Sequence, residues 1–89
     1  MNQSEQRSRI MTVANIRDPE GKDHFEVMFL ESARFYRVSK ANVKSGVILA
    51  TLRGAMATKH PVKVVLTTVN GDVIEDVLID QTSATSQDL

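Results

Sequence analysis

The chain has 89 residues, a formal net charge of zero, 42% hydrophobic residues, 25% charged residues and no cysteine. This length indicates one domain, and the lack of cysteine excludes disulfide bonds and thiolate chemistry. Because a domain this small buries only about 60% of its unfolded surface, we expect it to gain stability as a homo-oligomer.

Both ends of the chain are polar. Residues 1–8 lack the apolar stretch of a signal peptide, and residues 81–89 are rich in Ser, Thr and Gln. We predict that both segments are disordered and that residues 9–80 form the single domain. The longest apolar run, Gly46–Leu52, is too short to span a bilayer. The sequence therefore predicts a cytoplasmic protein with no membrane partner.

Three strands are predicted in the first half of the chain, over residues 9–16, 24–30 and 33–38. The first is rich in β-branched residues, and the second alternates apolar and polar residues with a period of two. The third carries two neighbouring aromatic residues. We predict that Phe35 points into the core and that Tyr36 lies on the opposite face, beside Arg34.

A helix is predicted over about Val43–Thr58, with Asn42 as its N-cap. One face is apolar, and a second face carries a row of small residues, Gly46, Ala50 and Gly54. Because Gly destabilises a helix interior by up to about 1 kcal/mol relative to Ala, the two glycines indicate that another backbone comes close. We predict that this row is an interface with the sheet or with a neighbouring subunit.

Two further strands are predicted, over residues 62–69 and 72–79, joined at Asn70–Gly71, a signal for a type I′ hairpin. The order of elements is then β-β-β-α-β-β. This order matches an OB-like five-stranded antiparallel barrel with its helix between the third and fourth strands. The alternative is an open α+β sheet with one helix packed on it.

The central part of the chain resembles a known family. After the aromatic pair Phe35-Tyr36 and the Ala/Leu-rich helix comes the segment Lys59-His60-Pro61-Val62-Lys63-Val64. This arrangement resembles the OB-fold B subunits of bacterial AB toxins of the pertussis and subtilase type, over roughly Ala33–Leu66. The resemblance implies the fold and oligomerisation, and no binding residue is carried over from it.

Charge is unevenly distributed along the chain: residues 1–31 carry −2, residues 32–71 carry +7 and residues 72–89 carry −5. The central segment could bind single-stranded nucleic acid, because OB-folds combine a cationic groove with stacking aromatics. The residues of this candidate site are Arg34, Tyr36, Arg37, Lys40, Lys44, Arg53 and Lys63. The other interpretation is that the acidic last strand neutralises these cations within the fold.

Enzyme chemistry is not indicated by the sequence. There is no Gly-x-Ser-x-Gly motif and no phosphate-binding loop. His24 and His60 are the only histidines, and we interpret them as surface residues. We therefore predict no catalytic residue, no metal, no cofactor and no enzymatic activity.

Assembly is the function that the sequence favours most. The two strands after the helix are apolar on both faces, a pattern expected where both faces of a sheet are covered. A small barrel covers only one of them. We therefore predict a non-enzymatic, homo-oligomeric binding or assembly module of unknown ligand, with single-stranded nucleic-acid binding as the alternative.

Overall fold

The computed structural model describes residues 7–80. They form the elements β1 (Ser8–Met11), β2 (Val13–Arg17), β3 (His24–Phe29), β4 (Phe35–Ser39), α1 (Ser45–Thr58), β5 (Val62–Leu66) and β6 (Ile74–Ile79). The prediction of a mainly β protein with one helix is confirmed. The predicted disordered ends lie outside the described residues, except for Arg7, whose carbonyl accepts from the Leu66 N–H at 2.7 Å, and Ser8, which belongs to β1.

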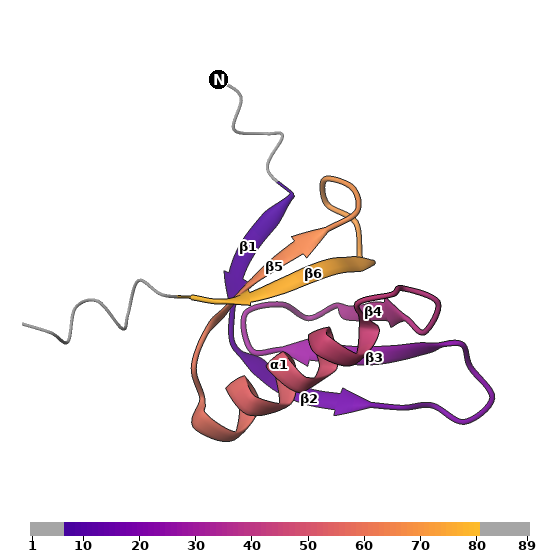
Figure 1. Cartoon of the computed structure of the whole chain (residues 1–89). Coiled ribbons are helices and arrows are strands. Elements are labelled where there is room, and N and C mark those ends of the chain that lie inside the picture. Colours follow the sequence, from indigo (N-terminus) through magenta and orange to yellow (C-terminus); the bar gives the residue numbers. More distant parts are fainter. Residues whose placement is uncertain (1–6, 81–89) are drawn as a thin grey trace, which may run out of the picture.

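The strands form two three-stranded antiparallel sheets (Figure 1). Sheet A has the order β1-β5-β6, and sheet B has the order β2-β3-β4. A single parallel bridge joins Arg37 of β4 to Val73, which precedes β6. The predicted five-stranded barrel is not confirmed, because the described chain has six strands in two sheets. No helix within residues 7–80 is long and apolar enough to cross a membrane.

Thr12 marks the point at which the chain passes from sheet A to sheet B. Its backbone N–H donates to Glu31 Oε1 at 2.7 Å, and its carbonyl accepts from the Leu30 N–H at 2.9 Å. Both backbone groups thus bond to the loop after β3. The strand predicted over residues 9–16 is for this reason two strands, separated by a bend.

The inward face of β1 was not predicted, and β4 turns the opposite face inward from the one predicted. In β1, Met11 is buried and Ile10 is 50% exposed. In β4, Tyr36 is buried and Phe35 is 50% exposed. A shift of one residue moves every side chain of a strand to the other face. The Tyr36 ring lies inside because it packs edge-on against Phe29, with the ring centroids 5.3 Å apart.

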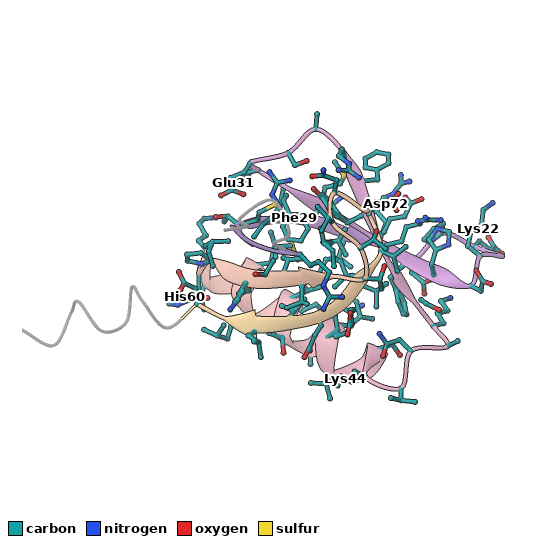
Figure 2. All side chains as sticks on the ribbon, turned by 90° about the horizontal axis from the view of Figure 1, so that it is seen from above. Lys22, Phe29, Glu31, Lys44, His60 and Asp72 are labelled. Atoms are coloured by element: carbon teal, nitrogen blue, oxygen red, sulfur yellow. The ribbon has the colours of Figure 1, made fainter. Side chains whose placement is uncertain are left out.

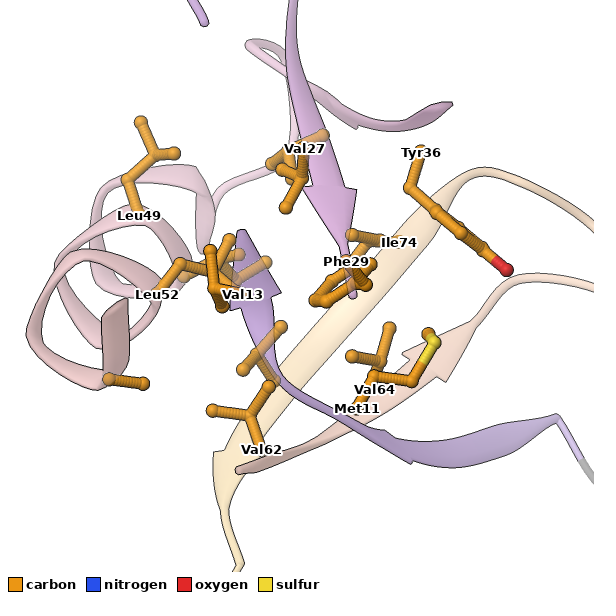
Figure 3. Packing of buried hydrophobic residues seen from close by; sticks show 14 of the residues in the cluster. Met11, Val13, Val27, Phe29, Tyr36, Leu49, Leu52, Val62, Val64 and Ile74 are labelled. Atoms are coloured by element: carbon orange, nitrogen blue, oxygen red, sulfur yellow. The ribbon is translucent and has the colours of Figure 1, made fainter. Parts of the chain in front are cut away.

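The core lies where the two sheets and α1 meet. Figure 3 shows Leu52 directed from α1 toward Val13 of β2. Burial of one such aliphatic side chain stabilises the fold by roughly 1.5–3 kcal/mol. Every element contributes to the core, whose buried residues include Met11, Val13, Val27, Phe29, Tyr36, Val38, Ile48, Leu52, Val62, Val64, Ile74 and Val77.

The two ends of α1 differ in how well they were predicted. The helix begins two residues later than expected, and Lys44 occupies the N-cap position without a side-chain cap bond. Asn42 is therefore not the N-cap; its Oδ1 accepts from the Lys44 N–H at 2.7 Å in the preceding turn. At the other end Lys59 adopts a left-handed conformation, with φ of 59°. Pro61 follows, and the helix stops as predicted.

The connection between β5 and β6 is longer than the predicted two-residue hairpin, since it runs from Thr67 to Val73. A type I′ turn needs positive φ at both central residues, but of the pair Asn70–Gly71 only Asn70 has it, at 63°. Gly71 is favoured for another reason. A Cβ at this position would clash with the Thr68 hydroxyl oxygen and would lie 3.2 Å from the Thr68 carbonyl oxygen.

Candidate protein interface

The side of α1 that points away from the core is almost free of charge. Arg53 is the one charged residue within the helix. Gly46, Ala50 and Gly54, the predicted interface residues, are all exposed, and Val47 beside them is 67% exposed. A Cβ placed on either glycine would meet no atom within 4 Å. The neighbouring backbone that the glycines predict is therefore not supplied by residues 7–80.

This surface is called the outward face of α1 below; its residues are Val43, Gly46, Val47, Ala50, Gly54 and Ala57. They recur at intervals of three and four residues and so lie on one side of the helix. Val43, in the turn before the helix, is 96% exposed. A surface helix normally carries polar residues on its outer side, whereas a helix that is apolar all round is normally buried.

The outer surface of sheet A is a second exposed apolar region. Ile10, Lys63 and Leu78 lie side by side across its three strands. Ile10 and Leu78 are each about half exposed, and Val65 is half-buried on the same face. The prediction that the strands after the helix are apolar on both faces is borne out at β5 and β6, whose inner residues form the core.

A groove opens between the Thr12 bend and the last turn of α1. Its volume is about 450 Å³. Leu30 is one of its lining residues and is 71% exposed. The groove is lined by Thr12, Val13, Ala14, Leu30, Met56 and Lys59.

Charged residues of opposite sign lie at and beside this groove. Glu31 does not line it but is bonded to Thr12, which does: its carboxylate accepts from the Thr12 N–H at 2.7 Å and from the Thr12 hydroxyl at 2.8 Å. Burial raises the pKa of Glu31, but these hydrogen bonds outweigh it and hold the pKa below its ordinary value. Lys59, on the helical wall, has no acidic partner among residues 7–80.

The predicted nucleic-acid residues do not form a free cationic surface. Arg37 Nη2 lies 3.0 Å from Asp72, Lys40 Nζ lies 2.9 Å from Asp18, and Lys44 Nζ lies 3.1 Å from Asp76. Two of these three acids come from the acidic last part of the chain, as the charge-pairing interpretation predicts. Exposed pairs of this kind each contribute about 0–1 kcal/mol to stability.

The remaining predicted ligand residues are spread over several surfaces. Tyr36 is buried, so no base can stack on it, and Arg34 lies over its ring at 5.3 Å. Arg53 belongs to α1 and Lys63 to the outer surface of sheet A. Figure 2 shows Lys44 and Asp72, the partner of Arg37, well apart on the molecule.

The exposure of the aromatic residue Phe35 was not predicted from the sequence, which placed this side chain in the core. It lies on the outer surface of sheet B beside Met28, and the Arg17 guanidinium lies 5.8 Å from its ring centroid. Arg17 also donates through Nε to Glu26 at 3.1 Å, and this hydrogen bond lowers the pKa of Glu26. Correct assignment of the inward face of β4 would have revealed Phe35.

His24, predicted to be a surface residue, lies close to two acidic side chains. His24 lies between Asp23 and Glu26, with nitrogen–oxygen distances of 3.7 and 3.8 Å. Within residues 7–80 no three His, Asp or Glu side chains are placed to hold a metal ion. A shallow polar cleft of about 190 Å³ beside His24 also includes Arg37 and Ser39.

No known protein-family model matches the chain, and no curated protein matches it. Two solved structures have a similar fold: a crystal structure of pro-protein-glutaminase, with 19% identity and a TM-score of 0.71, and one of its A47Q2 mutant, with 18% identity and a TM-score of 0.70. Each covers 88% of this chain, but this chain spans only 26% of theirs. These two neighbours are not toxin B subunits, and the toxin resemblance stays a prediction.

The likeness to pro-protein-glutaminase corrects one prediction. The sequence was interpreted as that of a protein without enzymatic activity, and this is contradicted because the same fold occurs within the chain of an enzyme precursor. At 19% identity the likeness shows the fold alone.

Proposed function

We propose that this chain is an assembly module, and that copies of it associate through the outward face of α1. The observation that carries the proposal is that α1 is apolar on both sides while residues 7–80 cover only one of them. Val47 and Val43 would lose their contact with water when a partner covers this face. Gly46 and Gly54 have open space above them and so allow the partner's backbone to approach closely.

The similar fold within a longer chain supports a related form of this proposal. In pro-protein-glutaminase the matching part is about a quarter of the chain, so it is accompanied there by a much larger remainder. In a longer protein the outward face of α1 would pack against another domain. In both forms the same face is the docking surface.

Light scattering during size-exclusion chromatography tests self-association. We expect a mass above the 9.9 kDa of one chain, falling on dilution. The variant Val47→Lys places a charge in the centre of the face and should lower the mass. Val69→Lys is the matched control, since Val69 is also exposed but belongs to the β5–β6 connection. A wild-type mass of one chain at every concentration would exclude self-association.

We also propose that the two sheets together form an OB-like arrangement. In support, β1 and β2 are consecutive pieces of chain, and they pair with β5 and β3 respectively. At the opposite edges of the two sheets, formed by β4 and β6, the bridge between Arg37 and Val73 links one sheet to the other. With β1 and β2 counted as one bent strand, the elements follow the predicted order β-β-β-α-β-β.

Single-stranded nucleic-acid binding is a second candidate, favoured by one observation. Phe35 offers an exposed ring on the outer surface of sheet B with Arg17 above it, and exposed aromatics stack on bases. Fluorescence anisotropy with labelled oligo-dT at about 50 mM salt, where phosphate contacts are strong, tests it. Binding that Phe35→Ala removes would support this candidate, and no binding would exclude it.

A further inference from the structure

We propose that the groove between the Thr12 bend and α1 is a second, two-fold contact, in which Leu30 of each copy enters the groove of the other. This proposal adds to the assembly proposed above and rests on different residues. The occupant is a second copy of this chain. Three features of the groove favour that occupant over an unrelated partner.

The first feature is shape. Leu30 is 71% exposed although it is a large aliphatic residue. Its backbone is held in place, because its own N–H donates to the Thr12 carbonyl at 2.9 Å. The exposed side chain therefore extends from a fixed backbone position in the lining of a groove of about 450 Å³.

The second feature is self-complementarity. In a two-fold contact, the same patch serves both copies, so that if residue i touches residue j, then j also touches i. Such a patch must carry both a projection and a recess. Here Leu30 is the projection, and Val13 and Met56 are apolar walls of the recess. Insertion in both directions removes two leucines from water at once, which stabilises the pair.

The third feature is charge. Glu31 is held beside the groove by its two hydrogen bonds from Thr12, and it stays ionised at neutral pH, since its pKa is below the ordinary value. Lys59 is exposed on the helical wall, without an acidic partner among the residues that the structure describes. When two copies meet wall to wall about a two-fold axis, Lys59 of each faces Glu31 of the other. Two ion pairs then flank the two leucines.

The two proposed contacts together predict an assembly larger than a dimer. Two different two-fold contacts on one chain build either a closed tetramer or an open chain of copies. We expect a closed tetramer, with four times the 9.9 kDa mass of one chain. Loss of one contact should leave a dimer held by the other.

Light scattering of wild type, Leu30→Asp, Val47→Lys and the double variant tests the proposal. Leu30→Asp should weaken association by tenfold or more, as about 1.4 kcal/mol at a buried anchor implies. Each single variant should then be a dimer and the double variant a monomer. Leu30→Met should behave as wild type, and Val69→Asp controls for an added charge at an exposed valine.

The outcomes separate the two contacts. A wild-type mass that Leu30→Asp does not change overturns the groove contact, whatever Val47→Lys does. A dimer that Leu30→Asp dissolves and Val47→Lys leaves intact supports the groove contact and overturns the one at α1. A monomeric wild type overturns both. The circular dichroism spectrum of Leu30→Asp must match that of wild type, which shows that the variant is folded. If the spectra differ, Lys59→Glu takes the place of Leu30→Asp in the association test.

Lys59→Glu probes the charge pairs without touching the apolar groove walls. It places a second acid opposite Glu31 of the other copy, so we expect several-fold weaker association that high salt partly restores, because salt screens exposed charges. Lys59→Gln should have a smaller effect. Equal association of Lys59→Glu and wild type at low salt would contradict the proposed wall-to-wall arrangement.

Discussion

The two sides of α1 have similar composition but different surroundings. The inner side places Ile48 and Leu52 in the core, where both are fully buried. The outer side carries Val47 and two glycines over open space. The same kind of residue therefore stabilises the fold on one side and is available to a partner on the other. Substitutions on the inner side should change folding, and those on the outer side should change association.

The largest expected effect is on the inner side. Leu52→Ala removes a fully buried side chain and leaves a cavity, so the free energy of unfolding should fall by about 2–5 kcal/mol. Urea denaturation followed by circular dichroism measures it. A loss well below 1 kcal/mol would mean that α1 does not pack on the sheets as described.

On the outer side, Gly54→Ala should have the opposite effect on folding. The added Cβ meets nothing within 4 Å. Because Ala has a higher helix propensity than Gly, the free energy of unfolding should rise by about 1 kcal/mol. The same methyl group lies in the proposed contact and should weaken association. Urea denaturation at low concentration and light scattering at high concentration measure the two effects. A gain in both stability and association would argue against close approach at Gly54.

The order of strands and the helix could be predicted from sequence because each rests on a local pattern. The alternation of Phe25, Val27 and Phe29 placed β3 with the correct inward face. The inward faces of β1 and β4 could not be predicted in the same way. Both depend on contacts distant in sequence: the bend at Thr12 is held by Glu31, and Tyr36 is oriented by Phe29.

The candidate interface was predictable only in part. Gly46 and Gly54 are unusual for a helix interior, and this local signal indicated a special surface before any contact was known. The groove gave no such signal. Its walls come from the bend after β1, the loop after β3 and the end of α1, and nothing in the sequence places these segments together. Leu30 was interpreted simply as the last residue of a strand.

The smallest expected effect tests the wall of the groove. Glu31→Gln keeps an acceptor for Thr12 but removes the charge, so we expect a loss of under about 1 kcal/mol at pH 7. Because the folded pKa of Glu31 lies below 4.5, the stability it contributes is present above that pH and is lost as pH falls through the folded pKa. Urea denaturation at pH 7 and pH 3 measures the difference between variant and wild type. A difference that grows toward pH 3 would contradict the assigned direction.

The measurement that most directly tests the contact at α1 is the reactivity of a single thiol. The chain has no cysteine, so Ala50→Cys places one thiol in the middle of the outward face of α1, and Val69→Cys provides the control. We predict that maleimide labelling of Cys at position 50 slows at least tenfold between dilute and concentrated protein, while labelling at position 69 stays constant. Equal, concentration-independent labelling at both positions would show that no copy covers the outward face of α1.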